Sequence, residues 1–268
     1  MPDNKKTTNG FQIAALFVRT DGVYFGLPFV DPWDEPRDAR LYKGPFPVVC
    51  HSPCQRWGRY WSGGPSAKVR RIKGDDDGCF AHAKWAVDTF GGVLEHPEAS
   101  HAWEAFGIPK PPRKGGWIPA GRGWTCCVEQ GHYGHRARKA TWLYAVTPEK
   151  PADFIWGASA GERLDEGFHT REERQAARAA GQKAVPRLSV VENLSTPPLF
   201  RDLLIAIAVS AAQTAQASTV KAAEKHRKTA QEIADETMQS AAREVSDPRR
   251  PRRSLQRWSA KLGKYVDA

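Results

Sequence analysis

A cysteine in this chain stands where a reactive nucleophile could be displayed. The apolar run Pro45 to Cys50 reads as a buried strand, and it leads into the loop residues His51, Ser52, Pro53 and Cys54. The proline ring fixes the backbone before Cys54, while a loop leaves the sulfur exposed. An exposed thiolate attacks electrophilic carbon and forms a covalent intermediate. Cys54 is therefore a candidate catalytic nucleophile.

Three further polar stretches follow Cys54 in a recognisable order. With the cysteine loop, the stretches are Ser52-Pro53-Cys54-Gln55, Glu95-His96-Pro97, Gln130 to Arg138, and Asn193 to Leu199. In this order they resemble the cysteine loop, the Glu-Asn-Val element, the Gln-x-Arg-x-Arg element and the closing Gly-Asn-x-Val-Pro-Pro motif of cytosine-5 DNA methyltransferases. The resemblance spans Pro45 to Ala208.

The resemblance implies a role for each motif. Cys54 would add to ring carbon 6 of a cytosine and make carbon 5 nucleophilic. Glu95 would bind near ring nitrogen 3, and Arg138 and Arg136 would hold the base or the cysteine loop in place. The same likeness puts three residues at the substrate, namely Pro53, Gln55 and Gln130. The cytosine must leave the base stack to be reached.

The implied methyl donor is S-adenosylmethionine. The family opens with a strand and a glycine-rich turn, and here that stretch runs from Ala15 to Gly22. Phe17 and Asn193 would line the cofactor pocket, and Asp31 or Asp34 would hold the ribose. Arg19 stands where the family has a close-approach glycine, so its side chain is expected to crowd the cofactor.

The elements that must position these residues alternate between strand and helix. Phe11 to Val18 reads as a first strand, Gly78 to Phe90 as a helix, and Val93–Leu94 as a short strand. Two more strands, around Thr125–Val128 and Thr141–Tyr144, are joined by the loop Gln130 to Lys139. This order predicts an α/β fold with a Rossmann-like, open, mostly parallel sheet and flanking helices.

The later part of the chain divides into three segments. Residues 148–190 form a polar insert or connector with a short helix from Arg171 to Ala180. A helix with Leu199, Leu203, Ile207 and Ala211 on one face closes the first domain, residues 1–212. Residues 213–268 are expected to form a long solvent-exposed helix, suited to a partner, and a basic tail around Arg249 to Arg253.

Charge and composition indicate the partner and the compartment. Lys and Arg number 40 against 30 Asp and Glu, a net charge of +10 that favours phosphate backbones, so DNA is the expected partner. Five irregularly spaced cysteines and a polar N-terminus predict a cytoplasmic protein. Small methyltransferase-like proteins of this kind occur in bacteriophages, and a phage-encoded chain would lie in the host cytoplasm. The apolar run Leu203 to Val209 is shorter than the roughly 20 residues of a membrane span.

Other readings of the same residues were weighed. A zinc site could draw on Cys50, Cys54, Cys126, Cys127, His132 and His135, but their spacing matches no common finger, and no metal is expected. The acidic tract Asp75–Asp77 reads as a helix N-terminus. The alternative functions are a catalytically inactive nucleic-acid-binding or regulatory protein on the same scaffold, and a different pyrimidine-modifying enzyme that still uses Cys54.

Overall fold

The computed structural model describes residues 12–63, 71–161, 171–181, 188–212, 256–259 and 264–267. The chain forms two compact units, Met1–Gln216 and Ala217–Ala268. In the second unit, β8 (Gln256–Ser259) pairs antiparallel with β9 (Lys264–Asp267). The expected long helix after residue 212 and the basic run Arg249 to Arg253 lie outside the described residues.

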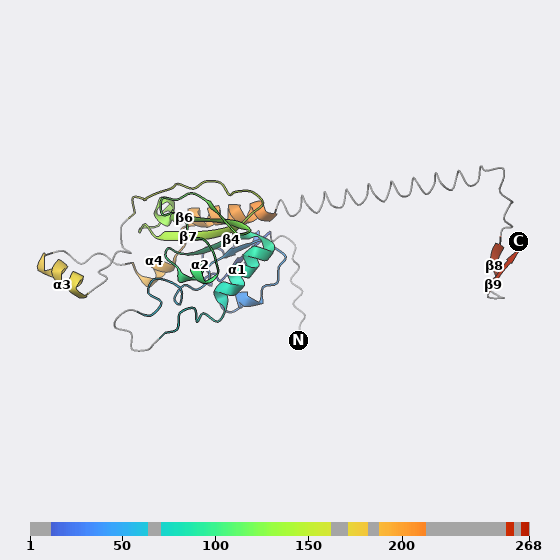
Figure 1. The fold of residues 1–268 in the computed structure, drawn as a ribbon, viewed down its shortest axis with the longest axis horizontal. Helices are drawn as coiled ribbons and strands as arrows, with labels where there is room; N and C mark the ends of the chain where they lie inside the picture. Colours follow the sequence, from blue (N-terminus) through green and yellow to red (C-terminus); the bar gives the residue numbers. More distant parts are fainter. Residues whose placement is uncertain are drawn as a thin grey trace. The chain divides into compact units, whose positions relative to one another are not determined.

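The first unit is built on one mixed sheet of seven strands with flanking helices (Figure 1). The strand order across it is β2-β1-β3-β4-β7-β6-β5. The strands are β1 (Ile13–Leu16), β2 (Val30–Trp33), β3 (Val48–Cys50), β4 (Gly92–Pro97), β5 (Ile118–Ala120), β6 (Gly123–Glu129) and β7 (Ala140–Val146). The prediction of an α/β fold is confirmed.

Only half of the sheet is parallel. β1 pairs in parallel with β2 on one side and β3 on the other, and β3 pairs in parallel with β4. β7 pairs antiparallel with both β4 and β6, and β5 pairs antiparallel with β6. The expectation of a mostly parallel sheet is corrected here, because the short connection from β6 to β7 allows only a hairpin, not a crossover.

Gly92 fixes how β3 lies against β4. It is paired with Val48 and has a φ of +114°. A Cβ atom at this position would lie 2.0 Å from the carbonyl oxygen of Val48, far inside van der Waals contact. Only glycine permits the two backbones to approach so closely. In the resulting register Cys50 lies beside Leu94, directly before the functional loops.

One face of the sheet is covered by α1 (Cys79–Phe90) and α2 (His101–Ala105). Phe80, Ala83 and Val87 on α1 and Trp103 on α2 are fully buried in the same hydrophobic cluster. The acidic tract before α1 serves as a helix N-terminus, because the carboxylate of Asp76 accepts hydrogen bonds from the amides of residues 78 and 80. The same carboxylate accepts from the indole of Trp57.

The other face is covered by the helical residues 198–212, drawn in orange in Figure 1. Phe200, Leu204 and Ala208 on this helix are fully buried in a second cluster with Ile13, Val49 and other sheet residues. The stretch Val191–Ala212 is long and apolar enough to cross a membrane by length and composition alone. Its helix is interrupted at residues 195–197, and packing against the sheet accounts for its apolar face.

Shorter elements connect these layers. α3 (Arg171–Ala179) lies where the short helix was predicted, and α4 (Val190–Leu194) begins with a capping box between Ser189 and Glu192. Two 3-10 helices, η1 (Ala39–Leu41) and η2 (Gln130–Tyr133), follow β2 and β6. η2 occupies the start of the segment that was expected to be a loop.

Candidate active site

A cleft of about 1680 Å³ opens at the carboxyl ends of β1, β3 and β4. The chain leaves β1 toward β2 on one side and returns to β3 on the other, so the two loops diverge at this point. A divergence of this kind leaves a crevice in open α/β sheets, and ligands bind there. Phe17, Cys54, Glu95 and Asn193, drawn from distant parts of the sequence, all line it.

Cys54 reaches the cleft from a tightly wound loop after β3. Its carbonyl oxygen accepts hydrogen bonds from the amides of Trp57 and Gly58, at 3.0 and 2.7 Å. Trp57 anchors the loop because its side chain is buried in the core cluster under α1. The sulfur stays half-buried at the cleft wall. The loop therefore fixes the position of the thiol without sealing it from a ligand.

The ionisation of Cys54 depends on its neighbours. Burial raises the pKa of the thiol, and the negative charge of Glu95 raises it further. The backbone amide of Cys54 and the positive charge of Lys139 act in the opposite direction. The resting sulfur is accordingly a thiol, and a nearby cation is needed to favour the thiolate.

Glu95 extends from β4 with both carboxylate oxygens hydrogen-bonded. Nδ1 of His51 lies 3.1 Å from one oxygen, and the side-chain amide of Gln130 donates to the other at 3.2 Å. Burial alone raises the pKa of Glu95, but the hydrogen bond and charge of His51, with Lys139 and His96, outweigh it and hold that pKa below its ordinary value. The side chain is an ionised carboxylate surrounded by donors.

His96 supports the site from the opposite face of β4. Strand alternation turns its ring away from Glu95 and into the aromatic cluster of Phe80 and Trp103. Its Nδ1 lies 2.7 Å from the hydroxyl of Ser100. Burial lowers the pKa of His96 to about 4, although Glu95 and the backbone of Pro53 oppose the shift. The ring is neutral and structural at physiological pH.

Lys139 is a site residue that the sequence analysis missed. It has a φ of 44° at the entrance to β7, and its side chain lines the cleft. The ammonium group donates a hydrogen bond of 2.6 Å to the carbonyl oxygen of Ser195. Burial lowers the pKa of Lys139, while Glu95 and Cys54 oppose that shift. The one available signal was its position next to Arg138 in a basic loop.

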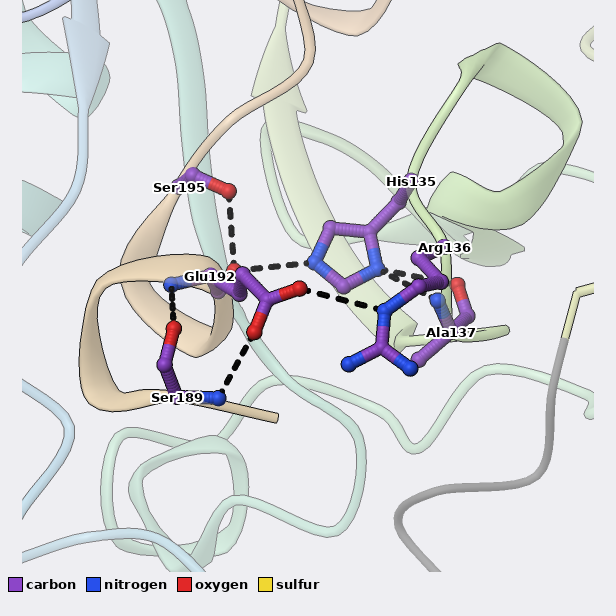
Figure 2. A network of polar contacts seen from close by, with 6 residues as sticks. All are labelled: His135, Arg136, Ala137, Ser189, Glu192 and Ser195. Atoms are coloured by element: carbon purple, nitrogen blue, oxygen red, sulfur yellow. Dashed lines mark hydrogen bonds and ion pairs between the residues drawn. The ribbon is translucent and has the colours of Figure 1, made fainter. Parts of the chain in front are cut away.

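Arg136 and Arg138 do not line the cleft. As Figure 2 shows, the guanidinium of Arg136 forms an ion pair with Glu192 on α4, at 3.1 Å. In the same network Nε2 of His135 lies 3.1 Å from the carbonyl oxygen of Glu192. Arg138 donates to the carbonyl oxygen of Gly161. The structure thus gives Arg136 a contact that joins the segment after η2 to α4.

Three of the four predicted cofactor residues line the cleft, and one does not. Phe17, Asp34 and Asn193 line the cleft, whereas Asp31 lies outside it and forms an ion pair of 2.7 Å with Arg37. Asp34 is buried at the end of β2 and accepts a hydrogen bond of 2.8 Å from the hydroxyl of Thr20. Phe17 has a φ of 58°, a rare conformation for a non-glycine residue, directly after β1.

Two of the three predicted substrate residues line the cleft, and the third is buried. Pro53 and Gln55 line the cleft beside Cys54. Gln130 is fully buried beneath it, where its amide nitrogen bridges Glu95 and the hydroxyl of Thr141. Cations and carboxylates both line the cleft: Arg19, Arg40, Arg59, Arg71, Lys139 and Arg178 on one side of the balance, and Asp34, Glu35, Asp38, Asp77, Glu95 and Glu98 on the other. The cleft therefore combines a thiol–carboxylate pair with a lining of mixed charge.

The zinc reading finds no geometric support in the part of the chain that the structure describes, where no group of three or more His, Cys, Asp or Glu residues could hold a metal ion. Cys126 and Cys127 lie side by side on β6 and are both buried. Burial raises the pKa of Cys127 to about 12, so its sulfur is a protonated thiol.

Comparison with known proteins leaves the site to be interpreted from its own geometry. No protein-family model matches the chain, and no curated protein matches it significantly.

Proposed function

We propose that this chain is a DNA cytosine-5 methyltransferase-like enzyme that uses S-adenosylmethionine and attacks a flipped cytosine with Cys54. The observation that carries the proposal is the convergence of Cys54 and Glu95 on one cleft that is also lined by Phe17 and Asn193. A binding protein would have no requirement to place a thiol and a carboxylate in the same cleft. The net charge of +10 supports a nucleic-acid substrate.

The strand order supports a Rossmann-like reading of the parallel half. β1 lies at the divergence point, β2 is its outer neighbour, and β3 and β4 follow on the other side. In this reading a single strand lies beyond β1, which agrees with the short stretch between Leu16 and Cys54. The antiparallel β7 and β6 then complete the sheet beyond β4.

The cleft has room for both ligands that the reaction requires. Pockets for one small-molecule ligand span roughly 300–1,000 Å³, and this cleft measures about 1680 Å³. Asp34 and Glu35 follow β2 and present carboxylates, which can accept hydrogen bonds from a ribose. Phe17 offers an aromatic ring at the end of β1. S-adenosylmethionine, when bound there, supplies an electrophilic methyl group.

The residues of the chain account for the chemistry at the base. Ionised Glu95 takes the proton of Cys54, and Sγ forms a bond to ring carbon 6. The positive charge of Lys139 favours the thiolate. Glu95 passes the proton to ring nitrogen 3, which leaves carbon 5 nucleophilic, and the ionised carboxylate then accepts a hydrogen bond from the exocyclic amino group of cytosine. After methylation, water takes the carbon 5 proton, the bond from Sγ to carbon 6 breaks, and the proton of ring nitrogen 3 returns through Glu95 to the sulfur, which regenerates the free cysteine.

Two observations favour the alternative of an inactive nucleic-acid-binding scaffold. Arg19 lines the cleft where the resemblance expects a glycine, and burial with the charge of Glu95 raises the pKa of Cys54. Both can be overcome on ligand binding, because Arg19 is exposed and long, and because Lys139 lies near the sulfur. The activity test must therefore distinguish an active enzyme from an inactive nucleic-acid-binding scaffold.

The test is transfer of labelled methyl from S-adenosylmethionine to mixed-sequence DNA. The native chain is expected to incorporate label, Cys54→Ala to incorporate none, and Glu95→Gln to lose at least tenfold, since general acid–base groups contribute about 10²–10⁴ in rate. His132→Gln is the matched control, because that ring binds the carbonyl oxygen of Gly157 outside the cleft. Absence of incorporation, with salt-dependent DNA binding that survives both substitutions, would establish the inactive scaffold instead.

A further inference from the structure

His51 lines the cleft and takes no part in the chemistry proposed above. It directly follows β3, and its backbone amide donates to the carbonyl oxygen of Leu16 on β1. This bond fixes the residue at the divergence point of the sheet. Its side chain and that of Tyr24 both line the cleft.

The ring of His51 bridges two side chains. Nδ1 lies 3.1 Å from Oε2 of Glu95, and Nε2 lies 2.8 Å from the hydroxyl of Tyr24. A carboxylate is an acceptor only, so Nδ1 carries the hydrogen of the first contact. In the neutral ring Nε2 is then an acceptor and receives the hydrogen of the Tyr24 hydroxyl. Each partner thus determines which nitrogen carries the proton.

Tyr24 is suited to fixing this arrangement. Its side chain is buried, and burial with the charge of Glu95 raises the pKa of the phenol well above its usual range. The hydroxyl therefore remains protonated and available as a donor. Its ring lies 5.4 Å from that of His51, in tilted contact, which restricts rotation of the imidazole. The geometry is that of a hydrogen-bonded chain from Tyr24 through His51 to Glu95.

We infer that His51, oriented by Tyr24, is a positioning residue that holds the Glu95 carboxylate in the cleft and directs it at the substrate. Oε1 is held by Gln130 and Oε2 by His51, and each oxygen retains capacity to accept from a ligand. The substrate class that fits is a pyrimidine that presents an amino donor, as cytosine does. A 4-oxo pyrimidine would bring its carbonyl oxygen against the carboxylate. The inference rests on the proposed function for the identity of the substrate.

Other charged or titratable groups interact electrostatically with Tyr24 or Glu95. They are Lys139, Cys54, His96, Arg201, Asp202 and Cys50. Lys139 and His96 also lower the pKa of Glu95, but neither makes a hydrogen bond to it among the described residues. The direct contact of His51 distinguishes it from these longer-range influences.

The experiment measures the effect of the Glu95 charge on the reactivity of Cys54, and it does not require methyl transfer. Alkylation of Cys54 by iodoacetamide is followed from neutral to alkaline pH, with the peptide that contains Cys54 quantified by mass spectrometry. Glu95 raises the pKa of Cys54, so Glu95→Gln should move the alkylation midpoint to lower pH. A shift of about one unit corresponds to about tenfold in reactivity on the acidic side.

A double-mutant cycle then tests whether His51 acts through Glu95. Without the donor of His51, the burial of Glu95 favours its neutral form, so in the His51→Leu background Glu95→Gln should shift the midpoint much less than in the native chain. His51→Asn, which retains an amide donor near the position of Nδ1, should restore most of the native shift. Tyr24→Phe should reduce the shift partially.

Equal Glu95→Gln shifts in the native and His51→Leu backgrounds would overturn the inference. If His51→Leu does not fold, as judged by circular dichroism, His51→Asn and Tyr24→Phe complete the test, since identical shifts in the native, Asn and Phe backgrounds likewise contradict a role for the chain of hydrogen bonds. If the Glu95→Gln shift depends on His51 but no methyl transfer is detected, the positioning role holds and the proposed function is wrong. If methyl transfer occurs but the shift does not depend on His51, the proposed function holds and the positioning role is wrong.

Discussion

The ammonium group of Lys139 joins two segments that are 56 residues apart, because it donates to the carbonyl oxygen of Ser195 while it lies near Cys54 and Glu95. Ser195 directly follows α4, and α4 contributes Asn193 to the cleft. One side chain therefore links the proposed cofactor wall to the proposed nucleophile. Of the cations in the segment after η2, Lys139 lines the cleft, whereas Arg136 and Arg138 do not.

Lys139→Met should slow both alkylation of Cys54 and methyl transfer. The loss of its charge raises the pKa of the Cys54 thiol, so less thiolate is present at neutral pH. We expect at least a fewfold decrease in the iodoacetamide rate. Arg136→Gln is the matched control, because Arg136 pairs with Glu192 outside the cleft. A larger loss of activity in Arg136→Gln than in Lys139→Met would contradict this assignment.

An oligonucleotide that carries 5-fluorocytosine should trap the proposed intermediate. After Cys54 adds to carbon 6 and carbon 5 is methylated, fluorine cannot leave as a proton does, so the Sγ–carbon bond persists. The expected product is a protein–DNA band stable in denaturing gel electrophoresis, formed with S-adenosylmethionine and missing in Cys54→Ala. The same band in Cys54→Ala would show that another residue is the nucleophile.

Phe200→Ala should strongly destabilise the first unit. Phe200 is fully buried, and its ring lies 5.7 Å from that of Tyr133. Truncation of a buried phenylalanine costs about 3–5 kcal/mol in the free energy of unfolding, measurable by urea denaturation. Leu199→Ala is the matched control, because Leu199 is 63% exposed and exposed sites usually change stability by no more than about 0.5 kcal/mol. Similar costs at the two positions would argue against packing of this helix on the sheet.

The free energy of unfolding should fall as the pH is lowered from 6.5 to about 4, because folded His96 stays neutral in this range. Burial lowers the pKa of His96 from 6.5 to about 4 in the folded chain. Between these values the unfolded chain binds a proton that the folded chain does not, so unfolding becomes more favourable, by up to about 3 kcal/mol for this group. His96→Gln should reduce the difference between urea midpoints measured at neutral and acidic pH, and an unchanged difference would contradict this assignment.

Much of the sheet follows from the sequence because its strands are apolar and bounded by turn residues. β1, β3, β4, β6, β7 and α1 all overlap the segments predicted for them. β2 was missed because it contains Pro32, which interrupts a strand-like pattern. A proline is tolerated there because β2 is an edge strand and its outer side needs no hydrogen bonds.

The polar motifs beside two strands made part of the candidate site predictable. Cys54, in the loop after β3, and Glu95, within β4, were predicted in this way, and their strands are adjacent in the sheet. The orientations of Arg136 and Lys139 were not, because contacts with α4 and Ser195 determine which side chain of the loop faces inward. His51 required the structure, since Tyr24 and Glu95 are 27 and 44 residues away from it in sequence.

Gly92 makes the proposed chemistry dependent on a residue that takes no part in it. Any side chain at this position would meet the carbonyl oxygen of Val48 and push β3 and β4 apart or shift their pairing. A slip of one residue would turn Glu95 to the face that His96 now occupies. The pairing of the two strands that lead to the proposed nucleophile and carboxylate thus requires a residue without a side chain at position 92, so a substitution of Gly92 would disturb the proposed site while Cys54 and Glu95 remain unchanged.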